Sequence, residues 1–236
     1  MSVLLTPQDA LAIDATRAIK TGDVDALQRL LREHPDLANA RIQGRKGGWR
    51  TLLHVAADWP GFFPNAPHSV RALIAAGAEL DARNAADGGE TPLHWAASSD
   101  DDDVAEVLID AGADLEAPAG SIGTPLDNAV GYACWHVARL LVRRGARVER
   151  LWQAAALGLL PRLNELLAEA SPEQINQAFW HACSGGQRRT AEALMSRGAD
   201  LTFVPEYARD TPLEAAAAVD TRRQTLVEWL REHGAT

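Results

Sequence analysis

A short motif that recurs along the chain limits the folds available to it more than any other feature. Residues 91–97 read TPLHWAA, and variants of this motif stand at 51–57 (TLLHVAA), 124–130 (TPLDNAV) and 211–217 (TPLEAAA). A helical unit of this kind cannot bury both of its faces alone, so each copy needs a neighbouring copy to pack against. The recurrence therefore predicts a row of similar units.

The best-preserved unit, residues 91–115, carries the signals of a helix–turn–helix. Thr91 is suited to an N-cap, and Pro92 is suited to the first helical turn because its φ is already set. Gly112 stands where a helix ends in a left-handed residue. A second helix is indicated by apolar residues at helical spacing, namely Val104, Val107, Leu108 and Ala111.

The number of units follows from a small residue in the first helix of each. The anchoring alanines are Ala18, Ala56, Ala96, Ala129, Ala154, Ala182 and Ala216, at intervals of 38, 40, 33, 25, 28 and 34 residues. Glycine motifs close several units, as at 77–80 (GAEL), 112–115 (GADL), 145–148 (GARV) and 198–201 (GADL). The predicted repeats span approximately residues 8–50, 51–90, 91–123, 124–148, 149–171, 172–210 and 211–236.

These motifs resemble the ankyrin repeat family, whose signature is T-P-L-H-x-A-A followed by G-A-D-x-N with a period of about 33 residues. The resemblance extends over the chain and is carried by alanine and leucine spacing at 149–184. It implies an all-α ankyrin-repeat solenoid of about seven helix–turn–helix units with β-hairpin-type finger loops. Residues 1–236 would then form a single ankyrin-repeat domain.

Composition narrows the possible partners and compartment. The net charge of −9 disfavours nucleic acid, which requires a basic stripe, and leaves room for a basic partner. The one basic cluster in a loop, Arg45 and Lys46 with Arg50, is small. No apolar run approaches the ~20 residues of a membrane span, and Met1–Leu5 lacks the features of a signal peptide. We therefore expect a cytoplasmic protein. We also expect it to be a monomer.

Cysteine and histidine spacing argues against a disulfide or a metal site. Cys134 and Cys183 belong to the fourth and sixth repeats, roughly 20 Å apart if packed helices lie ~8–10 Å apart, so both should be free thiols. His54 and His94 lie in adjacent repeats, also too far apart to share zinc ligands at ~2 Å. The family resemblance implies that these histidines bond the backbone of neighbouring loops. No metal or cofactor is expected.

The acidic run Asp100–Asp103 admits two interpretations. Carboxylates at a helix N-terminus can cap its free N–H groups and meet the positive end of its dipole. A calcium site of the EF-hand type needs spaced oxygen ligands and a turn glycine, which this run lacks. Helix capping is therefore the preferred interpretation.

Three irregular segments could contribute contact residues. The loop 36–50 should form a finger that carries Trp49 at its end; Trp49 either contacts a partner or folds back on its own repeat. The insertion 59–69, which includes Trp59 and Phe62, either covers the end of a helix pair or walls a site. The loop 202–210, with Tyr207, is expected to overhang a groove where the finger between 149–171 and 172–210 has been lost.

The family resemblance also places one helix position in the concave groove. That position is occupied by Trp95, Asn128, Gln153 and His181, and one helical turn later come Trp59 and Tyr132. These side chains are therefore expected to converge on one surface, although Trp59 and Trp95 could instead stack on each other. The candidate binding residues are Trp49, Trp59, Phe62, Trp95, Asn128, Tyr132, Gln153, His181 and Tyr207.

Two functions remain open. The resemblance implies a non-catalytic scaffold that binds an unidentified protein or peptide through an aromatic groove and finger loops. The alternative is a small-molecule pocket or an enzyme site near the 59–69 insertion, with His181 or His136 as the acid/base. The sequence contains no nucleophile elbow, phosphate loop or paired-carboxylate signature, so no catalytic residue is assigned.

Overall fold

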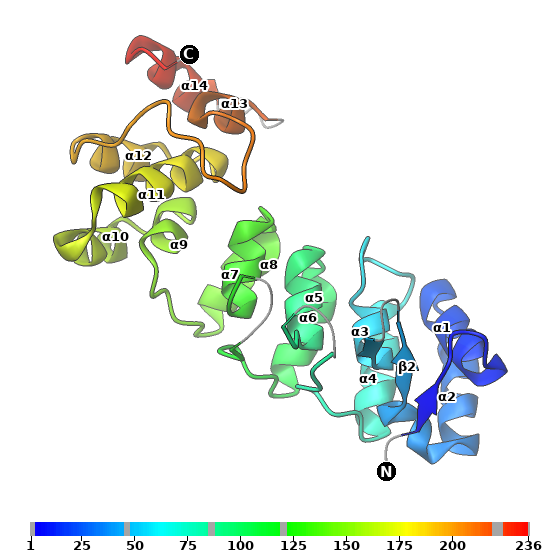
Figure 1. The fold of residues 1–236 in the computed structure, drawn as a ribbon. Coiled ribbons are helices and arrows are strands. Elements are labelled where there is room, and N and C mark those ends of the chain that lie inside the picture. The colour runs from blue at the N-terminus through cyan, green and yellow to red at the C-terminus, as the bar shows by residue number, and fades with distance from the viewer. Residues whose placement is uncertain (1–2, 45–47, 85–87, 119–121, 219–223, 236) are drawn as a thin grey trace. The chain divides into compact units, whose positions relative to one another are not determined.

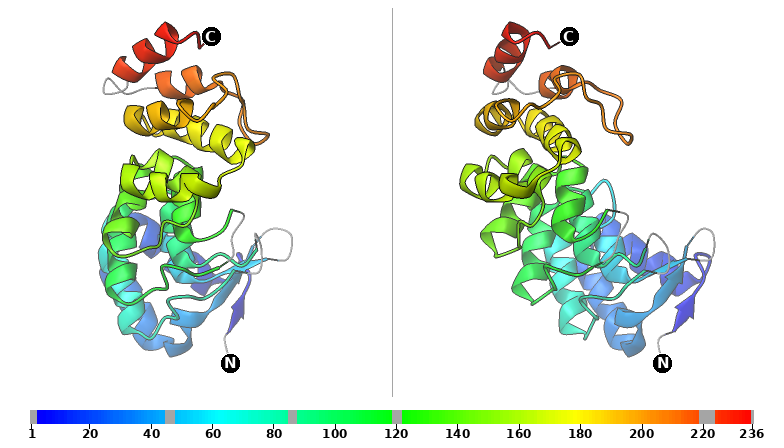
Figure 2. Two further views of the ribbon diagram at one scale, coloured as in Figure 1. Left: turned by 90° about the vertical axis from the view of Figure 1, so that its left-hand side faces the viewer. Right: turned by 60° about the vertical axis from the view of Figure 1, so that its left-hand side comes forward.

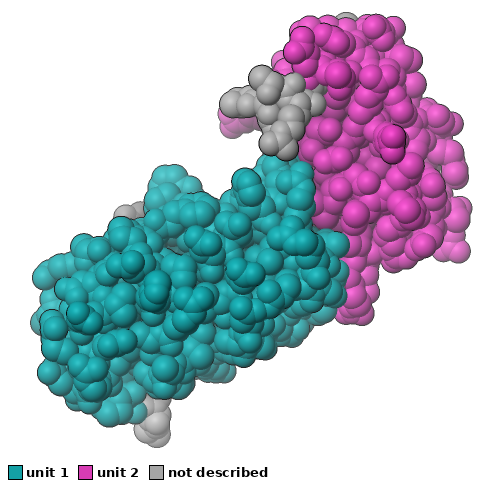
Figure 3. Space-filling model, turned by 180° about the vertical axis from the view of Figure 1, so that it is seen from behind, with its two compact units in different colours: residues 1–146 teal, residues 147–236 magenta. Residues whose placement is uncertain are grey.

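A computed structural model shows two compact units, Met1–Ala146 (unit 1) and Arg147–Thr236 (unit 2), which Figure 3 colours separately. Whether the two units make one domain remains a prediction. Arg45 and Lys46, the centre of the small basic cluster, lie outside the described residues. The structure describes residues 3–44, 48–84, 88–118, 122–218 and 224–235.

Unit 1 consists of helix pairs that succeed one another in chain order (Figure 1). In each pair, the first helix contacts the first helix of the next pair, and the second contacts the second, so that two helical layers form. The first layer is α1 (Ala10–Thr21), α3 (Leu52–Ala56), α5 (Pro92–Ser98) and α7 (Pro125–Gly131). The second layer is α2 (Val24–Glu33), α4 (Ala66–Ala75), α6 (Asp102–Asp110) and α8 (Trp135–Arg143).

Unit 2 repeats this arrangement with its own helix pairs. Its first helices, α9, α11 and α13, contact one another in succession. The predicted loss of a finger is confirmed, because a short 3-10 helix and residues 170–171 are all that separates α10 from α11. The helices are α9 (Leu151–Ala156), α10 (Leu160–Leu166), α11 (Pro172–Ser184), α12 (Arg188–Met195), α13 (Pro212–Ala217) and α14 (Gln224–Glu232), and the 3-10 helix is η3 (Leu167–Glu169).

The small anchoring residues pack in the interior of both units. Ala18 is 4% exposed, and the other anchoring alanines are fully buried. A methyl side chain allows the neighbouring backbone to approach closely, and a larger one would have to displace a packed helix. The fully buried alanines are Ala56, Ala96, Ala129, Ala154, Ala182 and Ala216.

The predicted helix starts and stops are present. Thr91 is the N-cap of α5 and Pro92 its first residue, and Ser171 with Pro172 begins α11 in the same way. Gly112 follows α6 with φ at 95°, the left-handed conformation that glycine adopts without steric cost. Local chemistry therefore sets these ends of α5, α6 and α11.

Strands occur in the first finger of unit 1. Strands β2 (Arg41–Gln43) and β3 (Trp49–Arg50) form the predicted antiparallel hairpin, preceded by the 3-10 helix η1 (Pro35–Asn39). Strand β1 (Leu4–Leu5), which the sequence patterns do not predict, pairs with β2 in parallel. In the described parts of the later fingers the backbone forms turns and no strands. Figure 2 shows the finger segments of unit 1 on the same side of its helices.

Both cysteines are buried free thiols, as predicted. Burial raises the pKa of the Cys134 thiol to about 12, and it raises the pKa of Cys183 as well. The thiolate is the nucleophilic form, so neither side chain is activated for chemistry. Among the helices that the structure describes, none is long and apolar enough to cross a membrane.

Candidate functional site

A depression in unit 1 brings together three aromatic residues predicted from the helix register. Its volume is about 290 Å³, and it opens beside the ends of α3, α5 and α7. Trp59, Trp95 and Tyr132 all line it, although they come from three consecutive repeats. The complete set of lining residues is Asp58, Trp59, Glu90, Trp95, Ser98, Ser99 and Tyr132.

The segment between α3 and α4 that carries Trp59 is tied to the repeats on both sides. The backbone N–H of Phe62 donates to the Asp101 carboxylate at 2.6 Å, which connects the segment to the following repeat. The Asn65 side-chain amide donates to the Gly22 carbonyl at 3.0 Å, which connects it to the preceding repeat. Gly22 has φ at 71°, and a β-carbon there would collide with the backbone of Pro64.

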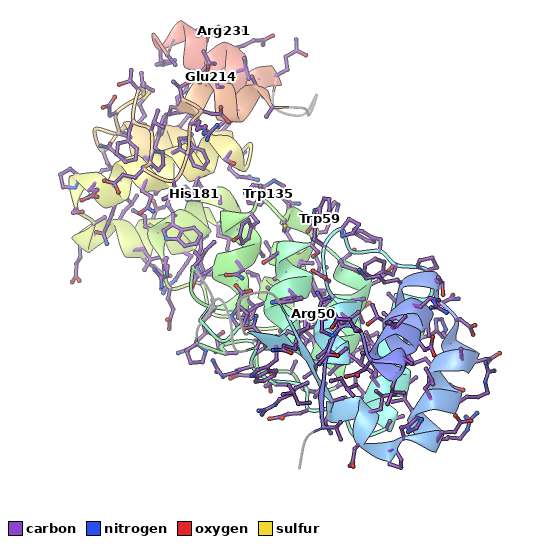
Figure 4. The ribbon with its side chains drawn as sticks, turned by 45° about the vertical axis from the view of Figure 1, so that its right-hand side comes forward. Arg50, Trp59, Trp135, His181, Glu214 and Arg231 are labelled. Carbon is purple, nitrogen blue, oxygen red and sulfur yellow. The ribbon has the colours of Figure 1, made fainter. Side chains whose placement is uncertain are left out.

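Trp59 and Phe62 are nevertheless exposed, at 77% and 58% (Figure 4 labels Trp59). The interpretation that these two rings cover the end of a helix pair is therefore wrong. Phe63 is half-buried, and the Lys20 ammonium lies 5.6 Å from the centre of its ring. An anchored backbone thus presents two large apolar side chains to solvent.

Trp95 forms the inner wall of the depression. It is half-buried, and its ring meets His54 edge-on, with ring centres 5.0 Å apart and planes at 77°. Within the described residues its ring contact is with His54, so the alternative in which Trp95 and Trp59 stack on each other is wrong. Trp95 is held by the preceding repeat and still faces the depression.

Asn128 is not a surface residue, contrary to the prediction. It is fully buried, and its side-chain amide donates to the Glu90 carboxylate at 2.9 Å and to the Ser98 hydroxyl at 3.2 Å. Its carbonyl oxygen has no hydrogen-bond partner among the described residues. Asn128 therefore lies behind the wall of the depression, where it positions Glu90.

Glu90 is a lining residue that the helix register could not reveal. It precedes Thr91 at the end of a finger, outside any helix, and it is 9% exposed. The groove prediction considered helix positions alone. The sequence feature that could have identified Glu90 is its position directly before the TPLH motif, where a finger returns to the helix layer.

Gln153 is also not a contact residue. It is 2% exposed, and its side-chain oxygen accepts the backbone N–H groups of Glu149 and Arg150, both at 2.9 Å. Its helix position faces the chain that enters α9. The amide is therefore committed to capping that helix.

His181 and Tyr207 belong to an aromatic cluster in unit 2. His181 is 3% exposed, stacks on Trp152 with ring centres 4.9 Å apart, and its Nε2 lies 2.9 Å from the Tyr207 hydroxyl. Burial lowers the pKa of His181 to about 4, and its Nδ1 has no partner in the described part of the chain. The loop 202–210 thus covers His181 through Tyr207, so His181 does not face an open surface.

His54 and His94 connect neighbouring repeats. Nε2–H of His54 donates to the carbonyl of Glu90, and that of His94 donates to the carbonyl of Gly123, both at 3.0 Å. In each, Nδ1 accepts the backbone N–H and the hydroxyl of the threonine that caps its helix, Thr51 or Thr91. The expectation that these histidines bond neighbouring loops is confirmed.

The environment of these histidines keeps them neutral. Burial lowers the pKa of His54 to about 4 and lowers the pKa of His94 as well. Both ring nitrogens are already bonded to protein groups. Among the described residues no group of three or more His, Cys, Asp or Glu side chains could hold a metal ion.

The acidic run serves as helix caps. Asp101 is the N-cap of α6 and accepts the backbone N–H of Val104 at 3.1 Å. Asp100 accepts the N–H groups of His136 and Val137 at the start of α8, and its other oxygen lies 2.7 Å from His136 Nδ1. The capping interpretation is confirmed, and His136, one acid/base candidate, is paired with Asp100.

Trp49 lies on the first finger and is half-buried. The Arg41 guanidinium lies 4.1 Å from the centre of its ring, a cation–π contact between β2 and β3. Trp49 therefore packs within its own finger and keeps part of its surface in solvent.

Comparison with known proteins decides the family. A family model described as "Ankyrin repeats (3 copies)" matches residues 15–119 and 65–150, which together cover more than half of the chain. The chain belongs to the ankyrin repeat family. Ankyrin repeats are generally protein–protein interaction scaffolds, and they bind protein partners.

A solved ankyrin repeat structure extends the likeness beyond the matched residues. The chain is similar to the ankyrin repeat domain of Bcl-3, a protein described as a unique member of the IkappaB protein family. Sequence identity is 25%, the match covers 92% of this chain and 97% of that chain, and the TM-score is 0.53. The all-α ankyrin-repeat fold is thereby shown, including the region where the sequence motifs are weak.

Proposed function

We propose that this protein is a non-catalytic scaffold that binds a partner protein or peptide at the depression lined by Trp59, Trp95 and Tyr132. The observation that carries the proposal is the 77% exposure of Trp59 on a segment anchored to both neighbouring repeats. An indole in water is unfavourable for the free protein and favourable once a partner covers it.

The properties of these three side chains support a role as anchors. Aromatic residues dominate the energetics of protein interfaces when they enter well-packed pockets. A backbone that is already held in place loses little conformational entropy when a partner binds, so more of the contact energy appears as affinity. Phe62, 58% exposed on the same segment, would extend the contact.

The shape of the depression supports a macromolecular partner over a small molecule. Small-molecule sites commonly enclose ~300–1,000 Å³ and bury most of the ligand. This depression, at about 290 Å³, is near the lower end of that range, and its Trp59 wall is 77% exposed, so it would leave much of a small ligand in water. Neither acid/base candidate for an enzyme, His181 or His136, is among the described residues that line it.

Affinity capture from the source cell tests the proposal. The wild type should retain a partner that Trp59→Ala and Trp95→Ala lose, while Arg139→Ala on the exposed side of α8 should retain it. Each variant must have the same melting temperature as the wild type, so that a loss of binding does not reflect a loss of folded protein. Equal recovery by all four proteins would contradict the proposal.

We also propose that the protein acts as a monomer in the cytoplasm. The buried free cysteines support a reducing compartment. Light scattering at micromolar concentration and cell fractionation test these two points. A stable dimer, or recovery with secreted proteins, would contradict them.

A further inference from the structure

A second depression, in unit 2, opens where a finger is missing. Its volume is about 360 Å³, and Trp152 of α9 lines it together with Gln174 and Gln177 of α11; we call it the notch. We propose that the notch binds an extended main-chain segment of a partner protein, one carbonyl of which accepts the Trp152 indole N–H. This second surface lies apart in sequence from the residues of the Trp59 depression, and the inference does not depend on that site.

The helix position of Trp152 has a fixed hydrogen-bond partner in other repeats. His54, His94 and Trp180 stand, as Trp152 does, two residues before an anchoring alanine. Each of these three rings lies within hydrogen-bond distance of a backbone carbonyl, at 2.8–3.0 Å. In all three, that carbonyl directly precedes the threonine that caps the next first helix. A finger or loop of the chain itself therefore supplies the acceptor.

The Trp152 indole N–H has no such acceptor. The chain runs from η3 almost directly into α11, and within the described residues Trp152 makes no hydrogen bond to the equivalent carbonyl, that of Ala170, or to any other group. Trp152 is 9% exposed, and a buried indole N–H usually finds a partner. Its Nε1 is not among the fully enclosed polar atoms, so it stays accessible from the notch that Trp152 lines.

This donor is held in place before any partner binds. The Trp152 ring stacks on His181, with ring centres 4.9 Å apart and planes at 30°, and His181, labelled in Figure 4, is itself buried. The His181 Nε2 lies 2.9 Å from the Tyr207 hydroxyl, which holds the imidazole in turn. A fixed indole loses little freedom when it donates a bond, so more of the bond energy appears as affinity.

Two glutamine amides beside Trp152 offer the complementary groups. Gln174 and Gln177 are three residues apart on α11, so they lie on the same side of the helix. The side-chain oxygen of Gln174 accepts the Ser171 N–H, which leaves its NH₂ group without a bond among the described residues. The NH₂ group of Gln177 donates to Tyr207, which leaves its oxygen without one. A peptide group carries both an acceptor and a donor that match them.

The notch suits main chain better than a charged side chain. Its charged lining residues have both signs, Glu149 and Glu169 against Arg150, so a ligand of either sign meets a like charge. The groups without a bond, an indole N–H, an amide NH₂ and an amide oxygen, are neutral. An extended segment would thus take the place of the missing finger.

A peptide display library tests the inference without knowledge of the natural partner. Random nine-residue peptides are selected on the full-length wild type, and those that bind Trp152→Phe equally well are removed. The remaining peptides should bind Trp59→Ala as tightly as the wild type. A selection that leaves no peptide would mean that water alone satisfies the indole and would overturn the inference, as would peptides that require Trp59.

A near-isosteric analogue then isolates the indole N–H. Benzothienylalanine keeps the shape of the tryptophan ring and replaces its N–H with sulfur. At position 152 it should weaken the selected peptides about fivefold at an unchanged melting temperature. At position 180 it removes the bond to Asp210, so it should lower the melting temperature and leave the peptide affinity unchanged. Equal affinity of the wild type and the position-152 protein would overturn the inference.

Ester replacement in a selected peptide tests whether the acceptor is main chain. An ester in place of one amide keeps every side chain and weakens the adjoining carbonyl as an acceptor. At one position it should weaken binding to the wild type about fivefold, and it should weaken binding to the benzothienylalanine protein less, because that bond is already lost. Equal losses at every position would overturn the inference. None of these results bears on the Trp59 depression, which affinity capture judges.

Discussion

The regular repeats at 51–123 and the divergent repeat at 172–210 both donate a side-chain hydrogen bond to the loop before the next repeat, but they use different side chains. In the regular repeats His54 and His94 donate to the backbone carbonyls of Glu90 and Gly123. In the divergent repeat, Trp180 stands in the equivalent helix position, two residues before the anchoring alanine. Its Nε1–H donates to the carbonyl of Asp210 at 2.8 Å.

All three accepting carbonyls immediately precede the threonine that begins the next first-layer helix, Thr91, Thr124 or Thr211. The repeat therefore needs a donor that reaches this carbonyl, and imidazole is one way to supply it. A histidine also accepts bonds from its own cap threonine, which an indole cannot do. In α11 the N–H of the cap residue is bonded by a different side chain: the side-chain oxygen of Gln174 accepts the Ser171 N–H at 2.9 Å.

The largest expected effect is on pH dependence, because the histidines that bridge repeats are buried and neutral. The pKa of His54 is lowered to about 4 in the folded protein, so between pH 6.5 and about 4 the unfolded chain binds the proton that the folded protein excludes. The free energy of unfolding should therefore fall as pH drops through this window, by on the order of 3 kcal/mol for His54. The pKa of His181 is also lowered to about 4, so His181 should make a similar contribution to the pH dependence of the stability of unit 2.

Urea unfolding at several pH values, with NMR titration of the histidine ring protons, checks this prediction. A His54→Gln variant should show a shallower decline in stability with acid. Titration of His54 near pH 6.5 in the folded protein would contradict the prediction.

His94→Ala should be the most destabilising of the single substitutions considered. His94 is fully buried, and its loss leaves the Thr91 N–H and the Gly123 carbonyl without their partner. We expect a loss of about 3 kcal/mol in the free energy of unfolding. His136→Ala is the control. The His136 side chain is 72% exposed, so its ion pair with Asp100 should contribute less than about 1 kcal/mol to the free energy of unfolding.

Trp180→Phe tests whether the donor, and not the ring, is what the divergent repeat requires. The change keeps an aromatic ring and removes the hydrogen bond to Asp210, so we expect a loss of about 1 kcal/mol. Trp180→His restores a ring donor and should be less destabilising than Trp180→Phe. The reverse order in urea unfolding would mean that ring packing matters more than the bond.

Tyr207→Phe should have the smallest effect. It removes a hydroxyl that bonds both Gln177 and His181, but Tyr207 is 63% exposed and its ring would remain. We expect a loss of about 0.5 kcal/mol in unit 2. Hydrogen exchange of the α11 amides checks this prediction. If their exchange rates increase as much in Tyr207→Phe as in Trp180→Phe, the loop over His181 stabilises unit 2 more than we expect.

Local signals in the sequence predict where the helices begin, end and pack, and their recurrence together with the family resemblance predicts the solenoid. Thr91 with Pro92 starts a helix, Gly112 ends one, and Ala96 permits close packing, each through chemistry within a few residues. The helix register also identified Trp95 and Tyr132 as lining residues.

The same register was wrong for Asn128 and Gln153, because a helix position says nothing about what a neighbouring loop covers. The end of the preceding finger brings Glu90 over Asn128, and the chain entering α9 places its N–H groups on Gln153. The register also placed Trp59 at the depression, but Trp59 lies in an irregular segment, and the sequence left open whether its ring covers a helix pair or stays exposed at 77%. Sites made by loops on a repeat scaffold require the three-dimensional structure.

Site-specific photo-crosslinking in the source cell tests the central claim, that the Trp59 depression is where a partner binds. A photoreactive phenylalanine analogue is placed at position 59 and, as a control, at position 139 on α8. The account predicts a discrete crosslinked adduct with another protein at position 59 and none at position 139. Adducts of equal yield at both positions, or none at position 59, would contradict it.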